Sequence, residues 1–164
     1  MIVDDAKGAL SRLMDDMNEE RRIKSKDDLN VGDIIEMDLD ENDGLTLKEG
    51  YAMRRKFVVV IGKTSNGDLY GAFLINSKID FSKRNAEMMS YQYPMLQKKY
   101  PEMLDYDSWL DCSELFDLKR RKIIARKAKV VSHLKSDDEQ NIRDIVAHSE
   151  LLTDQVKRKF GLLS

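Results

Sequence analysis

A pair of arginines before an apolar run is the feature of this chain that most directly suggests chemistry. Arg54 and Arg55 precede segment 57–61, Phe-Val-Val-Val-Ile, whose β-branched and aromatic residues are typical of a strand buried on both faces. A sheet would fix the position of both arginines while their guanidinium groups face a cleft. Because a guanidinium can donate two parallel hydrogen bonds to one phosphate, the pair predicts an anion site, above all for phosphate.

A second candidate group follows the next apolar run. Segment 69–75, Leu-Tyr-Gly-Ala-Phe-Leu-Ile, is expected to form a hairpin with the first run through the Asn66-Gly67 turn. Asn76 and Ser77 would then lie at the strand end, where an amide or hydroxyl could orient a phosphate or a ribose 2′-hydroxyl. Neighbouring strand residues point to opposite faces, so the two are equivalent only if the strand has already ended. The alternative is that both merely terminate the strand.

A run of basic residues extends from Lys119 to Lys135, where the sequence has eight Lys and Arg and no acid. Such a run, including Lys127 and Lys129, creates a local field that can follow a phosphate backbone. The alternative is a solvated strand face. Single-stranded RNA also needs stacking platforms, and the aromatic candidates near loops are Tyr51, Tyr70 and Phe81, with burial in the core as their alternative.

Composition limits the class of protein. The chain has 164 residues, a mass of 19.0 kDa and a net charge of −2, which suits one compact domain with additions. The single Cys112 cannot close an internal disulfide, and His133 and His148 do not provide zinc-ligand spacing. The acidic start and the absence of an apolar run near ~18 residues predict a soluble cytoplasmic protein with no membrane association, and no cofactor or metal is expected.

The hydrophobic pattern predicts an α+β chain, mainly β with helices. Residues 1–28 are expected to form an amphipathic helix capped by Asp4 or Asp5. Its apolar stripe would pack either on its own domain or on a partner chain, and it consists of Leu10, Leu13, Met14 and Met17. Residues 29–164 form the main domain, interrupted by a helical insertion over 81–107.

Further along, residues 108–113 and 122–131 are expected to be strands. Ser136 and Glu139 form a capping-box pattern before a helix, and a second helix follows over 151–160. Several short strands closed by C-terminal helices indicate a small SH3-like β-barrel.

The ordered set of motifs resembles the PemK/MazF (Kid-type) growth-inhibitor toxins of bacterial toxin-antitoxin systems. Residues 32–35, Gly-Asp-Ile-Ile, are similar to the family's opening strand, and residues 54–61, Arg-Arg-Lys-Phe-Val-Val-Val-Ile, to its Arg-Arg-Pro-x-Val-Val-Val-Ile element. Residues 72–77 lie where a strand ending in Ile-Thr-Ser is expected. Residues 111–121 resemble the family's segment ending in Asp-Lys-x-Arg-Leu, and the His133-Leu134 and Gly161-Leu162 pairs resemble its ending.

The resemblance implies an SH3-like PemK/MazF-like barrel and an endoribonuclease that cleaves single-stranded RNA without metal, independently of the ribosome or associated with it. Arg55 takes the position of the family's catalytic arginine, Arg54 and Lys56 flank it, and Asn76 or Ser77 supplies the second group. RNA, an antitoxin protein and a second copy of the chain are the implied partners.

The sequence departs from the family at Lys56, where a proline is usual, and at Asn76, where Thr or Ser is usual. These departures leave alternatives to an active toxin: a catalytically weakened relative, or a non-enzymatic module of the same fold that binds RNA, DNA or protein. A structural protein with no nucleic-acid role is a third interpretation, in which the basic run faces solvent.

Overall fold

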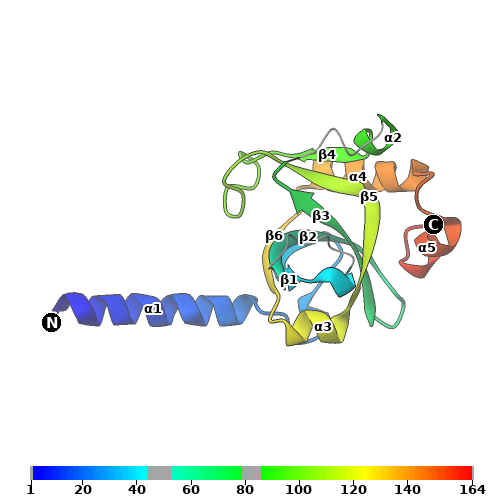
Figure 1. The fold of residues 1–164 in the computed structure, drawn as a ribbon. Helices are drawn as coiled ribbons and strands as arrows, with labels where there is room; N and C mark the ends of the chain where they lie inside the picture. The colour runs from blue at the N-terminus through cyan, green and yellow to red at the C-terminus, as the bar shows by residue number, and fades with distance from the viewer. Residues whose placement is uncertain (1, 44–52, 79–85, 164) are drawn as a thin grey trace.

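The computed structural model describes residues 2–43, 53–78 and 86–163, and it shows an α+β fold (Figure 1). Its sheet is antiparallel and curls into a half-barrel, with strand order β4-β5-β3-β2-β1-β6. The strands are β1 (Asp33–Leu39), β2 (Arg54–Lys63), β3 (Leu69–Asn76), β4 (Gln92–Met95), β5 (Ser108–Lys119) and β6 (Lys129–His133). The expected hairpin between β2 and β3 is confirmed.

Helices surround this sheet and also extend away from it. They are α1 (Ile2–Arg21), α2 (Ala86–Met89), α3 (Arg120–Ala125), α4 (Ser136–His148) and α5 (Asp154–Lys159), with short 3-10 turns η1 (Lys26–Asp28) and η2 (Glu41–Asp43). In Figure 1, α3 lies at the lower end of the half-barrel, α4 lies at the opposite end beside β4 and β5, and α5 lies at the right-hand side near the C-terminus.

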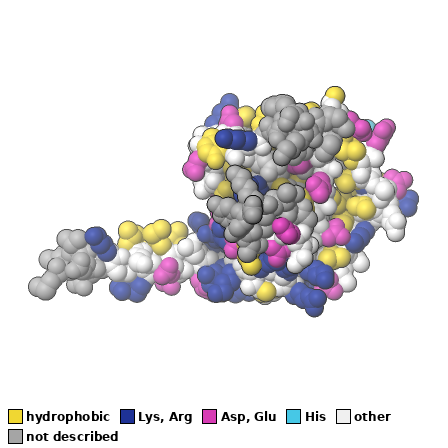
Figure 2. All heavy atoms as spheres, in the orientation of Figure 1, with side chains coloured by type: hydrophobic (Ala, Val, Ile, Leu, Met, Phe, Trp, Pro, Cys, Tyr) yellow, Lys and Arg dark blue, Asp and Glu magenta, His cyan; other side chains and the backbone are white. Residues whose placement is uncertain are grey.

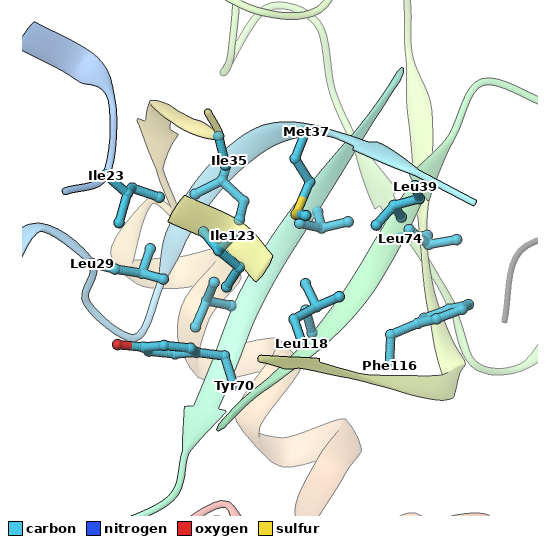
Figure 3. Packing of buried hydrophobic residues seen from close by; sticks show 14 residues of the cluster. Ile23, Leu29, Ile35, Met37, Leu39, Tyr70, Leu74, Phe116, Leu118 and Ile123 are labelled. Carbon is cyan, nitrogen blue, oxygen red and sulfur yellow. The ribbon is translucent and has the colours of Figure 1, made fainter. Parts of the chain in front are cut away.

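Both faces of β2 are buried, as its apolar run predicts. Val58 and Val60 pack in one apolar cluster, whereas Val59 packs in the other. Figure 3 shows the first cluster inside the curled sheet, with Ile123 of α3 and Leu29 lying against strand residues. The second cluster includes Ile142 and Val146 of α4 and lies on the other face of the sheet. Alternation along β2 therefore sends successive side chains into two separate cores.

The predicted strand over 122–131 is wrong in its first half. Residues 120–125 form α3, and only Lys129–His133 forms strand β6. The two are joined by a turn in which Lys127 has a φ of 55°. The helix buries Ile123 in the first apolar cluster, and the backbone N–H of Ala128 donates to the Ile123 carbonyl over 3.1 Å. The few apolar residues in this basic segment are compatible with the spacing of a helix or of a strand. The packing of Ile123 into the core favours the helix.

The insertion over 81–107 contains β structure as well as a helix. Its described part has one short helix, α2, followed by strand β4, which pairs with β5 from Gln92 opposite Asp111 to Met95 opposite Ser108. The strand predicted over 108–113 continues to Lys119, because its second half pairs with β3. Pro94 is tolerated because β4 is an edge strand.

The C-terminal helices are present, but the capping box at Ser136 is wrong. Lys135 is the residue that precedes α4, and Glu139 forms an ion pair with Arg143 at 2.8 Å. The first turn is instead anchored by buried Asp138, which accepts hydrogen bonds from the hydroxyls of Tyr93 and Tyr100, each at 2.6 Å. This carboxylate ties α4 to β4 and the turn that follows it.

The N-terminal helix ends at Arg21, before the end of the segment 1–28 expected to form it, and its apolar stripe does not cover its own domain. Helix α1 begins at Ile2, ahead of the proposed caps Asp4 and Asp5, and projects from the half-barrel (Figure 1). Its apolar stripe is exposed, whereas Ile23, just beyond the helix, is buried in the first core cluster. Among the described residues, no helix combines the length and apolar character required to cross a membrane.

Candidate functional site

The β2–β3 hairpin brings the two predicted groups of site residues together. Phe57 pairs with Ile75, so the start of β2 lies beside the end of β3. A small cavity of about 170 Å³ lies here. Its lining residues come from both strand ends and from the loop before β5, and they are Arg54, Arg55, Lys56, Phe57, Ile75, Ser77, Met103, Leu104, Asp105, Tyr106 and Ser108.

Arg55 is held in place by carboxylates of the neighbouring strand β1. Its Nε donates to Glu36 Oε1 over 2.8 Å, and its Nη1 donates to Asp38 Oδ1 over 3.4 Å. Partial burial acts to lower the pKa of Arg55, but the two carboxylates outweigh it and raise the pKa above its ordinary value. These contacts use two of the three guanidinium nitrogens, and the side chain is still 43% exposed. Arg55 is therefore oriented and charged at the cavity.

Among the described residues, Arg55 pairs with acids of β1 and not with the acid-rich loop that follows this strand. Asp43 of that loop pairs instead with Lys122 and Arg126. Glu49, like Tyr51 and Phe81, lies outside the described residues.

Lys56 and Asn76, the two departures from the family pattern, contact each other. Lys56 Nζ donates to Asn76 Oδ1 over 3.0 Å. Burial, with a smaller contribution from the nearby charge of Arg54, lowers the pKa of Lys56. Lys56 alternates with Arg55, so the two side chains leave opposite faces of β2. The Asn76 side chain thus binds Lys56. Of the two predicted residues Asn76 and Ser77, Ser77 is the one that lines the cavity.

Lys129 of β6 is connected to this site through Glu36. Its Nζ lies 3.6 Å from Glu36 Oε1, the same oxygen that accepts from Arg55, and it also donates to Asn18 Oδ1 of α1 over 3.3 Å. The strand register explains the proximity, because Glu36 pairs with Lys129 on one side and Asp38 pairs with Arg55 on the other. Two residues proposed from distant sequence segments therefore belong to one charged row across β2, β1 and β6.

The remaining basic candidates differ in their environments. Lys127 is exposed at the turn after α3, away from the strand positions expected for it. Lys122 and Arg126 each form an ion pair with Asp43 of η2 at 2.5 Å. Arg126 also pairs with Asp40, just before η2, at 3.0 Å. In Figure 2, Lys and Arg side chains gather along the lower edge of the molecule and at its junction with α1, interspersed with acids.

Asp43 is the buried centre of that second cluster, with a side chain that is 2% exposed. Burial would raise the pKa of Asp43, but hydrogen bonds from Lys122, from the Asp40 backbone N–H and from Arg126 outweigh it and hold the pKa at about 2. Two of the eight basic residues in the run thus serve a structural ion-pair network.

Tyr106 is the cavity residue that sequence reasoning missed. Tyr106 is 60% exposed, and it lines the same cavity as Arg55 and Ser77. Tyr70, by contrast, is 1% exposed and belongs to the core, which confirms the alternative considered for it. The signal available in the sequence was a tyrosine between Asp105 and Asp107, because an aromatic residue flanked by acids favours a surface loop.

Within the described residues, no group of three or more His, Cys, Asp or Glu side chains is placed to hold a metal ion. Comparison of the chain with known protein families and with curated proteins finds no matching family model and no matching relative.

Proposed function

We propose that this chain is a PemK/MazF-like endoribonuclease that binds single-stranded RNA across the cavity between β2 and β3 and cleaves it without metal. The observation that carries the proposal is the convergence of Arg55 and Ser77 on one cavity, beside the exposed ring of Tyr106. The antiparallel half-barrel is compatible with the SH3-like barrel that the resemblance implies, and the helical additions are built around it.

Each group has a defined task in the proposed reaction. The ribose 2′-hydroxyl loses its proton to water as its oxygen attacks the adjacent phosphorus. The bond from phosphorus to the 5′-oxygen of the next nucleotide then breaks, that oxygen takes a proton from water, and a 2′,3′-cyclic phosphate remains. Arg55 donates hydrogen bonds to the phosphate oxygens as negative charge accumulates on them. The Ser77 hydroxyl orients the phosphate or the 2′-hydroxyl. A base stacks on Tyr106, and Lys129 contacts the backbone further along the strand.

Substitution of Arg55 tests this proposal. The wild-type chain should arrest growth on induced expression and cleave a fluorescently labelled single-stranded RNA in EDTA, whereas Arg55→Ala should lose at least about 100-fold in cleavage rate. Arg143→Ala is a matched control, because this arginine is exposed on α4 and pairs only with Glu139 of its own helix among the described residues. Circular dichroism should show both variants folded. Equal cleavage by wild type and Arg55→Ala would contradict the proposal.

A non-enzymatic RNA-binding module of the same fold is the second candidate. It is favoured by the ion pairs that already engage Arg55 and by the Lys56–Asn76 hydrogen bond at the two departures from the family. In this case the wild type would bind the RNA without cleaving it, and Arg55→Ala would weaken binding. DNA and an antitoxin protein are further ligands under either function. Absence of both cleavage and binding in the wild type would reject both candidates.

A further inference from the structure

Helix α1 presents an apolar stripe that no part of the described chain covers. Leu10, Leu13, Met14 and Met17 are 58%, 56%, 55% and 44% exposed. Figure 2 shows hydrophobic side chains along one side of the projecting helix. Burying a large apolar side chain stabilises a protein by roughly 1.5 to 3 kcal/mol, so covering this stripe would contribute substantial free energy.

Among its described side chains, the helix also shows few interactions that would keep it folded alone. Most of the stability of a helix in a protein comes from the packing of its apolar face, and only a small part from helix propensity. The described ion pairs of Glu19 involve Arg22 and Lys24, at the C-terminal end. Within the helix, Asp15 precedes Glu19 by four residues and Asp16 precedes Glu20, which places like charges on the same face. A packing partner would supply the missing stability.

The spacing of the apolar residues indicates what that partner is. Three residues of the stripe, Leu10, Leu13 and Met17, follow Ala6 with the 4-3-4 spacing of heptad positions d, a, d and a, the seam of a two-stranded coiled coil. Glu20, at the next d position, ends the apolar seam. In a parallel pair, Asp16 at position g faces Arg21 at the following e position of the other helix, and the symmetry makes this opposite-charge contact twice.

We propose that α1 forms a parallel, in-register coiled coil with α1 of a second copy of this chain. The interface is isologous and closes as a dimer, with both half-barrels at the C-terminal end of the coil. Binding of α1 to an anionic membrane surface is disfavoured, because the helix has more acidic than basic residues, whereas membrane-surface helices are rich in Lys and Arg.

Cysteine cross-linking tests both the pairing and its direction. The one native cysteine, Cys112, is buried, so a new cysteine on α1 reports on the helix. In a parallel pair, residue 6 meets its own copy, and Ala6→Cys should form an intermolecular disulfide under mild oxidation at low micromolar protein. In an antiparallel pair the two copies of residue 6 would lie roughly 15 Å or more apart at 1.5 Å per residue, too far for a disulfide. Asp15→Cys, on the opposite face of the same helix, is the matched control and should remain uncross-linked.

Mass measurement by light scattering tests the contribution of the stripe. The double variant Leu10→Glu with Leu13→Glu should halve the molecular mass of the wild-type particle, while Ser11→Glu should leave it unchanged. Circular dichroism and a retained thermal transition show whether the half-barrel is still folded. A monomeric wild type, an unchanged mass in the double variant, or equal cross-linking of Ala6→Cys and Asp15→Cys would overturn the proposal, as would a stripe that binds lipid vesicles or another protein in place of its own copy.

Discussion

Two clusters near β1 each contain an arginine held by two carboxylates, but the clusters differ in how exposed their side chains are. At the cavity, Arg55 contacts Glu36 and Asp38, and Arg55 and Asp38 are 43% and 40% exposed. Beside α3, Arg126 contacts Asp40 and Asp43, and the Asp43 side chain is 2% exposed. Exposed pairs contribute little stability and can exchange partners, whereas buried pairs are costly to break. The same chemistry is therefore accessible to solvent at one place and buried within the fold at the other.

The largest difference between the clusters should appear in stability. Asp43→Ala leaves the charges of Arg126 and Lys122 without their buried partner and should lower the free energy of unfolding by about 3 kcal/mol. Asp38→Ala, the matched change at the cavity, should cost less than about 1 kcal/mol. Urea unfolding followed by circular dichroism measures both. Equal losses would mean that the two clusters do not differ in the way burial indicates.

The two clusters should also differ in how the free energy of unfolding depends on pH in the acid range. The pKa of Asp43 is about 2 in the folded protein, below its usual value of 3.8. A carboxylate with a lowered folded pKa stabilises the fold fully above its unfolded value, so this contribution, about 2 kcal/mol, should be lost as the pH falls from about 4 towards about 2. Subtracting the pH profile of Asp43→Asn from that of the wild type should reveal this step. An identical profile for the variant would assign the acid sensitivity to other carboxylates.

RNA affinity should respond only to acids of the exposed cluster. Asp38→Asn removes a negative charge next to Arg55 and should tighten binding of single-stranded RNA about threefold, because the guanidinium is released for phosphate. Asp40→Asn, next to Arg126, should leave the affinity unchanged. Fluorescence anisotropy with a non-cleaved analogue lacking the reacting 2′-hydroxyl measures both. Equal effects of the two substitutions would point to a general field instead of a site at Arg55.

The smallest expected effect concerns the basic residues themselves. Lys129→Ala should reduce the slope of log affinity against log salt by about 0.7, the value for one lost phosphate contact on a single strand. Lys122→Ala should leave the slope unchanged, because Lys122 is engaged with Asp43. If Lys122 altered the slope and Lys129 did not, the RNA path would run over α3 and not over the row from Arg55 to Lys129.

Several elements could be predicted because their patterns are local. The apolar run at 57–61, the Asn66-Gly67 turn and the helical spacing of α1 each reflect periodicity or turn chemistry that a few neighbouring residues specify. The proximity of Arg55 to Ser77 also followed from the sequence, since a hairpin with a short turn brings the start of one strand next to the end of the other.

The less predictable elements depend on partners distant in the chain. Residues 120–125 form a helix because Ile123 packs into a core assembled from β1, β2, β3 and β5, and β4 is a strand because β5 offers it an edge. Propensity alone does not decide such short segments.

Sequence by itself determined which groups this protein has available: arginines at a strand start, a hydroxyl after the next strand, a basic run and an amphipathic helix. Tertiary structure decided which of them remain accessible to a ligand. Lys56 and Asn76 are joined across β2 and β3, Lys122 and Arg126 are engaged by Asp40 and Asp43, and Lys129 comes next to Arg55 through Glu36. The physical reason is that a charge finds its partner through space, and strand register and burial set those distances and the strength of each ion pair.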